Sequence, residues 1–173
     1  ISACLVGSEM CIRDRLYIVE GIFDAIALLH HDTPAVSMMS SAPFPEESLR
    51  ALKKACQEAD KRLPRLVWAL DNEPVAKANM RRWAKEARAL GFKCEAAVIP
   101  QRGSKKVDWN DLHQRWTFIE GDDERAKRIE QDLDEARHQG ALLLADSAEE
   151  KGLLMYEWDC LLYTSDAADD TPC

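Results

Sequence analysis

Residues 66–74 have the sequence LVWALDNEP, and this stretch decides the fold class. Its five consecutive apolar residues are typical of a short strand that is buried on both faces. Asp71, Asn72 and Glu73 follow at once, and Pro74 suits the first turn of a helix, where its missing N–H costs nothing. The stretch therefore predicts a buried strand that ends in carboxylates and leads into a helix.

The same pattern recurs on both sides of this stretch. Short apolar runs at residues 16–19, 35–37 and 95–99 predict further strands, and periodic segments at 22–30, 46–60 and from 108 onwards predict helices. The expected core residues of these helices are Phe23, Ile26, Ala27 and Leu29 in the first, Leu49, Leu52, Ala55 and Ala59 in the second, and Ala76, Met80, Trp83, Ala87 and Leu90 in the helix after Pro74.

Alternation of apolar strands with helices is the pattern of an α/β fold, in which helices cover both faces of a parallel sheet. From residue 119 the pattern becomes purely helical, with Ile129, Leu133 and Ala136 at helical spacing. We therefore expect one α/β domain over residues 16–118. Residues 119–159 are expected to form either helices packed on the domain or a linker.

Composition limits the class of protein. The chain has 173 residues, a formal charge of −8, 46% hydrophobic and 31% charged residues, which is the composition of a globular domain. It has no apolar run long enough for a transmembrane helix and no secretory signal pattern, so a cytoplasmic location is expected. It also lacks a phosphate-binding GxxxxGK loop and a CxxC pair for zinc.

The two ends have no steady helix or strand period. Residues 1–15 and 160–173 resemble translated sequencing adapters, and we expect them to be a non-native leader and tail; frayed natural termini are the alternative. On the first interpretation the natural protein continues beyond Asp159.

Acidic residues follow two of the predicted strands. Glu20 follows the first strand, Asp24 lies one helical turn later, and Asp71 and Glu73 follow the strand at 66–70. Ligands of open parallel sheets bind outside the carboxyl ends of the strands, so these carboxylates should converge there. Mg²⁺ or Mn²⁺ would neutralise them, since hard cations prefer oxygen ligands. Each feature alone could be a helix cap or a turn; their joint occurrence favours a metal site.

Basic residues follow the acidic ones. Residues 77–106 contain nine bases and two acids, and Lys77, Arg81, Lys85 and Arg88 form a stripe at helical spacing. This stripe could hold a phosphate backbone or simply be a solvated helix surface. Lys105 and Lys106 could contact a nucleotide phosphate, with Asp108 as a further carboxylate; the alternative is that Asp108 caps a helix whose Trp109 packs inward. We interpret the four histidines as structural.

Three segments resemble the TOPRIM domain family, especially the primases of plasmids, phages and integrative elements. YIVEGIFDA (17–25) is similar to the first TOPRIM motif, WALDNEP (68–74) to the second, and VDWNDLHQRW (107–116) to the segment after the last TOPRIM strand. The resemblance covers about residues 16–116, with the motifs in the family's order and spacing.

The resemblance implies a Rossmann-like TOPRIM sheet, Glu20 as acid/base, and Asp71 and the residue at 73 as Mg²⁺ ligands. It also implies RNA primer synthesis on a single-stranded DNA template from ribonucleotides during DNA replication, with a helicase domain or protein as a partner. An isolated TOPRIM unit could bind metal and nucleic acid without synthesising primer. The sequence departs from the family at Glu73, usually Asp, and at Ala76, often Gly.

Three alternatives remain open. The domain could be a non-catalytic nucleic-acid-binding TOPRIM module, or a nuclease that cleaves strands with the same residues. It could also be a phosphotransfer domain in which Asp71 itself is phosphorylated, although this leaves Glu20 and the basic stripe unexplained.

Overall fold

The computed structural model describes residues 15–39, 43–101, 103 and 106–169, with side chains up to Cys160. These residues form strands and helices in the following order: β1 (Arg15–Val19), α1 (Ile22–His30), β2 (Ala35–Ser37), α2 (Glu46–Glu58), β3 (Arg65–Trp68), α3 (Pro74–Ala89), β4 (Cys94–Ala96), α4 (Trp109–Thr117), α5 (Asp122–Leu144) and α6 (Ala148–Asp169).

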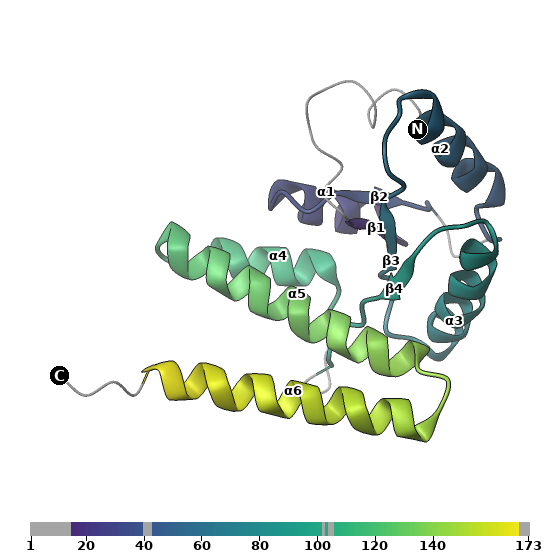
Figure 1. The fold of residues 1–173 in the computed structure, drawn as a ribbon. Coiled ribbons are helices and arrows are strands. Elements are labelled where there is room, and N and C mark those ends of the chain that lie inside the picture. Colours follow the sequence, from purple (N-terminus) through teal and green to yellow (C-terminus); the bar gives the residue numbers. More distant parts are fainter. Residues whose placement is uncertain (1–14, 40–42, 102, 104–105, 170–173) are drawn as a thin grey trace.

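The strands form one parallel sheet in the order β2-β1-β3-β4. In its register, Ile18 of β1 lies beside Val36 of β2 and Trp68 of β3. Helices lie on both sides of this sheet, as Figure 1 shows. The expected α/β class with a central parallel sheet is therefore confirmed.

Alternate strand residues supply the two halves of the core. Leu16 and Ile18 face the layer that contains α2 and α3, where Trp68 packs against Trp83 with ring centroids 5.6 Å apart. Tyr17 and Val19 face the layer of α1, α4 and α5. Because both faces are covered, β1 and β3 are apolar after their first residues, which is why their runs are visible in the sequence.

Helix α1 turns a different face to the core than the sequence predicted. The structure buries Asp24, Ala25, Ala27 and Leu28, whereas Phe23, Ile26 and Leu29 are exposed. Of the four residues that were predicted to face the core, only Ala27 is buried. On the buried side of α1, Asp24 accepts a hydrogen bond from the backbone N–H of Asn110 at the start of α4.

Strands β3 and β4 are shorter than predicted. Residues that follow each strand, which were predicted to belong to it, bond to helices instead. After Trp68, the carbonyl of Ala69 accepts a hydrogen bond from the indole Nε1 of Trp109 (2.9 Å). After Ala96, the N–H of Val98 donates to the carbonyl of Ala136 on α5 (2.8 Å). These residues stay buried, so hydropathy alone extends both strands too far.

The C-terminal helices are attached to this core. Leu133 and Ala136 of α5 are buried against the sheet, which agrees with the first of the two expectations for this region. Helix α6 lies along α5 (Figure 1), and His138 stacks on Trp158 with centroids 4.4 Å apart. It extends to Asp169, into a segment where the sequence predicted no regular structure. No helix in the described part of the chain could cross a membrane.

Candidate metal and nucleic-acid site

The loops that carry Glu20 and Asp71 leave the same end of the sheet. Strands β1 and β3 are parallel neighbours, and the N–H of Ala69 still bonds to the carbonyl of Ile18 (2.9 Å). Both loops therefore begin at the carboxyl end of the sheet, as the sequence predicted from parallel strands. We call this region the carboxyl end below.

Asp24 is the buried member of the acidic group, with only 9% of its surface exposed. Its Oδ1 accepts a hydrogen bond from the backbone N–H of Asn110 (3.2 Å). Burial raises the pKa of its carboxyl group, and the negative charges of Asp108 and Asp71 raise this pKa further. Asp24 is therefore bonded to the start of α4, two residues after Asp108.

Gly21 makes the close approach of Asp24 to the loop possible. A Cβ at position 21 would lie 2.7 Å from the Oδ2 atom of Asp24, closer than real side-chain contacts allow. A backbone hydrogen bond from Gly21 also favours the ionised carboxylate. Gly21 thus leaves room for the Asp24 carboxylate, which a side chain at position 21 would push aside.

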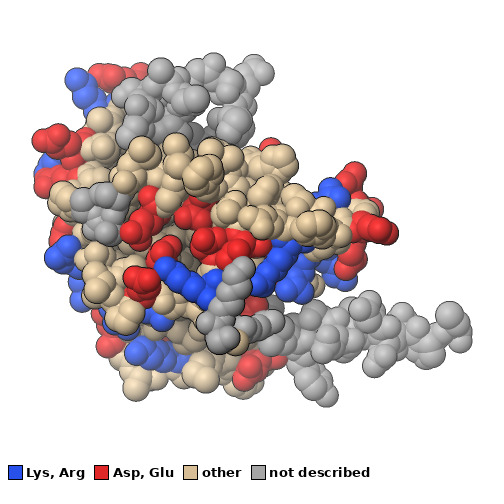
Figure 2. All heavy atoms as spheres, turned by 180° about the vertical axis from the view of Figure 1, so that it is seen from behind, with Lys and Arg blue, Asp and Glu red and all other residues tan. Residues whose placement is uncertain are grey.

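Lys106 joins the two acidic residues that follow β3. Its Nζ lies 2.7 Å from Oδ2 of Asp71 and 2.9 Å from Oε1 of Glu73. Hydrogen bonds with Asp71 and Glu73 raise the pKa of Lys106 well above its usual value, so it stays an ammonium ion at any physiological pH. Acidic and basic side chains also lie against each other in the middle of the face shown in Figure 2.

The donor set fits a hard divalent cation in chemistry but is not gathered around one. Asp24, Asp71 and Glu73 offer only carboxylate oxygens, the ligands that Mg²⁺ prefers. Within the described residues, however, no three His, Cys, Asp or Glu side chains are grouped so that they could hold a metal ion. The ammonium of Lys106 is the cation that Asp71 and Glu73 share.

Hydrogen bonds fix the loops around this group. Asn72 donates its Nδ2 to the carbonyl of Ile99 (2.7 Å), which ties the loop after β3 to the chain after β4. Asp108 caps α4, because its Oδ1 accepts from the N–H of Asp111 (2.7 Å), and Trp109 is buried. The capping alternative for this motif is confirmed; a role of Asp108 toward nucleotide or metal stays a prediction.

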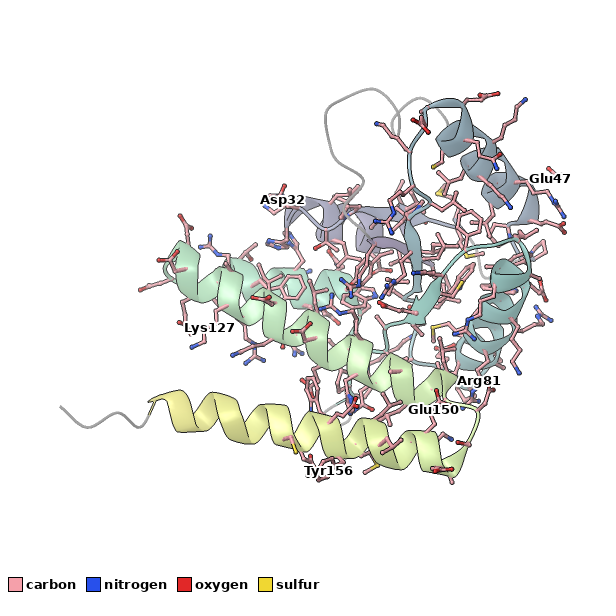
Figure 3. The ribbon with its side chains drawn as sticks, in the orientation of Figure 1. Asp32, Glu47, Arg81, Lys127, Glu150 and Tyr156 are labelled. Atoms are coloured by element: carbon pink, nitrogen blue, oxygen red, sulfur yellow. The ribbon has the colours of Figure 1, made fainter. Side chains whose placement is uncertain are left out.

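The basic stripe on α3 is partly used inside the protein. Arg81 donates its Nε to the carbonyl of Leu143 near the end of α5 (2.9 Å; Figure 3), and Arg88 donates to the carbonyl of Cys94 (3.3 Å). Lys85 lies 3.7 Å from Asp146. The sequence could not show these contacts, since the position of α5 was open. Binding of nucleic acid by this stripe, including Lys77, stays a prediction, and Lys105 lies outside the described residues.

Three of the four histidines form a cluster that sequence reasoning missed. The rings of His30, His31 and His113 lie 5.0–5.2 Å apart, and Nε2 of His31 is 2.9 Å from Nδ1 of His113. Burial lowers the pKa of both His31 and His113. The only sequence signal is the His30-His31 pair, because His113 comes from a helix 82 residues further along the chain.

A family and a solved structure are similar to this chain. The sequence profile of the family described as Toprim-like matches residues 17–113. The solved RNA polymerase domain of the Mycobacterium tuberculosis primase DnaG matches with 20% sequence identity and a TM-score of 0.49. That match covers 81% of this chain and 43% of that domain, so the chain spans less than half of its length. No curated protein sequence matches.

Proposed function

The chain belongs to the Toprim-like family, and on that basis we propose that its carboxyl end carries out metal-dependent nucleotidyl transfer of the DNA-primase type. The observation that supports this best is the shared cation. Asp71 and Glu73, the expected metal ligands, already hold a positive charge between them, at the end of the sheet from which the Glu20 loop also leaves.

The reaction would join two ribonucleotides on a single-stranded DNA template. The 3′-hydroxyl oxygen of one nucleotide bonds to the α-phosphorus of the next, the bond to the β-phosphate oxygen breaks, and pyrophosphate leaves. Glu20 would accept the proton of the attacking hydroxyl as general base. Asp24, Asp71 and Glu73 would hold Mg²⁺ or Mn²⁺, which when bound offsets the charge on the reacting phosphate.

Lys106 would have two positions in this scheme. Without metal it neutralises Asp71 and Glu73, and with metal its ammonium would be free to contact a nucleotide phosphate. The half-exposed side chain and its flexible stem allow such a change. The same residue would therefore serve the nucleotide-binding role predicted for it from the sequence.

A metal titration combined with product analysis tests the proposal. Mn²⁺ binding is followed by electron paramagnetic resonance, and a templated DNA substrate is incubated with ribonucleotides and Mg²⁺. We expect Asp71→Asn to weaken Mn²⁺ binding, and Glu20→Gln to abolish strand extension, about a hundredfold or more. Asp123→Asn and Glu124→Gln, exposed at the start of α5, are matched controls that should change neither. Extension that survives Glu20→Gln would refute the assignment.

A non-catalytic nucleic-acid-binding module is the second candidate. It is favoured by one observation: among the described residues, no three His, Cys, Asp or Glu side chains are grouped so that they could hold a metal ion. This candidate predicts single-stranded DNA binding that is the same with and without Mg²⁺ at constant ionic strength, and a free Mn²⁺ signal that the protein does not reduce. In the same assay, shortened rather than extended strands would indicate a TOPRIM nuclease.

A further inference from the structure

Among the exposed large apolar side chains near Glu20, two are more than two-thirds exposed. Phe23 is 71% exposed in the first turn of α1, and Met39 is 73% exposed just after β2. Both follow strands that are neighbours in the sheet, with Val19 of β1 in register with Ser37 of β2. Single exposed apolar residues are common, but two at one end of a sheet beside a reactive group need a reason.

Met39 is held in place by a hydrogen-bonded link to Glu20. The hydroxyl of Ser37 donates to the backbone carbonyl of Glu20 (2.9 Å), and the N–H of Met39 donates to that same hydroxyl oxygen (3.0 Å). The N–H of Met38 also bonds to the carbonyl of Val19 (2.9 Å). One serine hydroxyl thus connects the backbone of Met39 to the backbone of the expected acid/base.

The backbone of Met39 is strained. Its φ is 62°, in the left-handed region that side chains other than glycine, asparagine and aspartate rarely adopt. Such strain persists only where the surroundings impose it, and it occurs most often at binding sites. Here a large apolar side chain is kept in solvent in a costly conformation, although the sequence could have placed glycine or asparagine at this turn.

Phe23 lies in the first turn of α1, the helix that begins directly after Glu20 and Gly21. The next residue, Asp24, is buried and bonded to α4. The first turn of α1 therefore has a buried carboxylate on one side and an exposed aromatic ring on the other. The rotation of α1 that exposes Phe23 is the one that the sequence analysis did not predict. It leaves an exposed aromatic side chain three residues from Glu20.

We infer that Phe23 and Met39 form a contact surface for a nucleobase of the strand or nucleotide that is bound at Glu20. This inference rests on the proposed function, because that function places the sugar and phosphate of a nucleotide beside the Glu20 carboxylate. An aromatic ring stacks on any base, and a thioether packs well against flat rings. Neither side chain reads base edges, so the surface binds bases without sequence preference.

The test compares strands with and without bases. The probe is a fluorescently labelled 12-residue oligothymidylate, and the matched probe has the same sugar-phosphate backbone with abasic residues. Binding is measured by fluorescence anisotropy in Mg²⁺ without ribonucleotides, so that no catalysis is required. We expect the unaltered protein to bind the base-containing strand about tenfold more tightly, and Phe23→Ala or Met39→Ala to remove most of that difference.

Two controls match the chemistry of the variants. Phe118→Ala removes an aromatic ring that is 85% exposed after α4, and Met155→Ala removes a thioether that is 57% exposed on α6. Neither should change the preference for bases. Circular dichroism checks that each variant folds.

Each outcome decides the question. Equal binding of both probes by the unaltered protein, binding of neither probe, or a preference that survives both variants would overturn the inference. A lost preference in these variants together with unchanged Mn²⁺ binding would support it. The Mn²⁺ titration and the strand-extension assay test the nucleotidyl-transfer proposal separately. Failure of that proposal would therefore appear in those two measurements, and failure of this inference in the comparison of the two probes.

Discussion

Lys106 decides how easily a divalent ion can reach Asp71 and Glu73. Its ammonium contacts both carboxylates, so a metal ion must displace it before binding. Since this ion pair is half exposed, its contribution to the free energy is small, within about 1 kcal/mol. Replacing Lys106 with methionine should therefore tighten Mn²⁺ binding by a few-fold, about threefold to fivefold, measured by calorimetric titration.

The control for this variant is Lys127→Met, since Lys127 is exposed on α5 and points to solvent (Figure 3). Lys106→Arg should keep the weaker affinity of the unaltered protein, because the charge remains. If Lys106→Met weakened Mn²⁺ binding, Lys106 would support the metal rather than compete with it, and the two-position scheme would be wrong.

The acidic residues illustrate what sequence could and could not predict about the site. Glu20 and Asp71 were placed at one end of the sheet because parallel strands put their carboxyl ends together. The contact of Lys106 with Asp71 spans 35 positions and depends on a loop of irregular backbone, for which no periodic pattern exists. The sequence suggested that Lys106 contacts a negatively charged group, but it could not show that this group is the pair of carboxylates on Asp71 and Glu73.

The packing of α1 against α4 should depend on pH through the histidine cluster. His31 and His113 share a hydrogen bond that requires one ring nitrogen to donate and the other to accept, so protonation of both rings breaks it. Burial, and next the nearby histidines, lower the pKa of both rings. Arg125 lowers the pKa of His31 further, whereas Asp32 opposes this shift.

A lowered pKa in the folded state means that the unfolded chain binds protons more readily. The stability from this cluster is therefore complete above the unfolded pKa of about 6.5 and is lost as the pH falls below it. We expect the melting temperature to fall by several degrees between pH 7.5 and pH 5.0, and His113→Gln to reduce this fall. His138→Gln, on α5, should reduce it separately, because burial lowers the pKa of His138 as well. An unchanged pH dependence in His113→Gln would exclude the cluster as its cause.

Sequence patterns predicted which helices exist better than how they are rotated. The core face of α3 was correct because Met80, Trp83 and Ala87 follow a strict helical period and all are buried. For α1, apolar residues occur on nearly every side, so the pattern does not choose a face. The face that is buried carries Ala25 and Leu28 in the core and Asp24 bonded to the start of α4.

The joining of α5 to the sheet holds the C-terminal helices on the domain as a unit. At the point of contact, a Cβ on Gly140 would lie 1.9 Å from the carbonyl oxygen of Ala96 and 2.7 Å from the N atom of Ala97. These atoms belong to the backbone of β4 and the residue after it, which cannot move without breaking the pairing with β3. Glycine is therefore required where α5 crosses the sheet, although its φ is ordinary.

Replacing Gly140 with alanine should force α5 away from β4 and destabilise the protein. Overpacking of this kind costs about 1–3 kcal/mol, and a contact with rigid backbone belongs at the upper end. The measurement is the free energy of unfolding in urea, followed by tryptophan fluorescence, because Trp68 and Trp83 lie in the core on β3 and α3.

Gly152→Ala on α6 is the matched control, since it makes the same change inside a helix where nothing lies within 4 Å of the new Cβ. Alanine is the better helix former by about 1 kcal/mol, so Gly152→Ala should be neutral or stabilising, and the same gain is present at Gly140. The difference between the two variants then measures the packing of α5 on the sheet alone. Equal effects of the two substitutions would mean that α5 is free to leave β4, and that the C-terminal helices are not an integral layer of the domain.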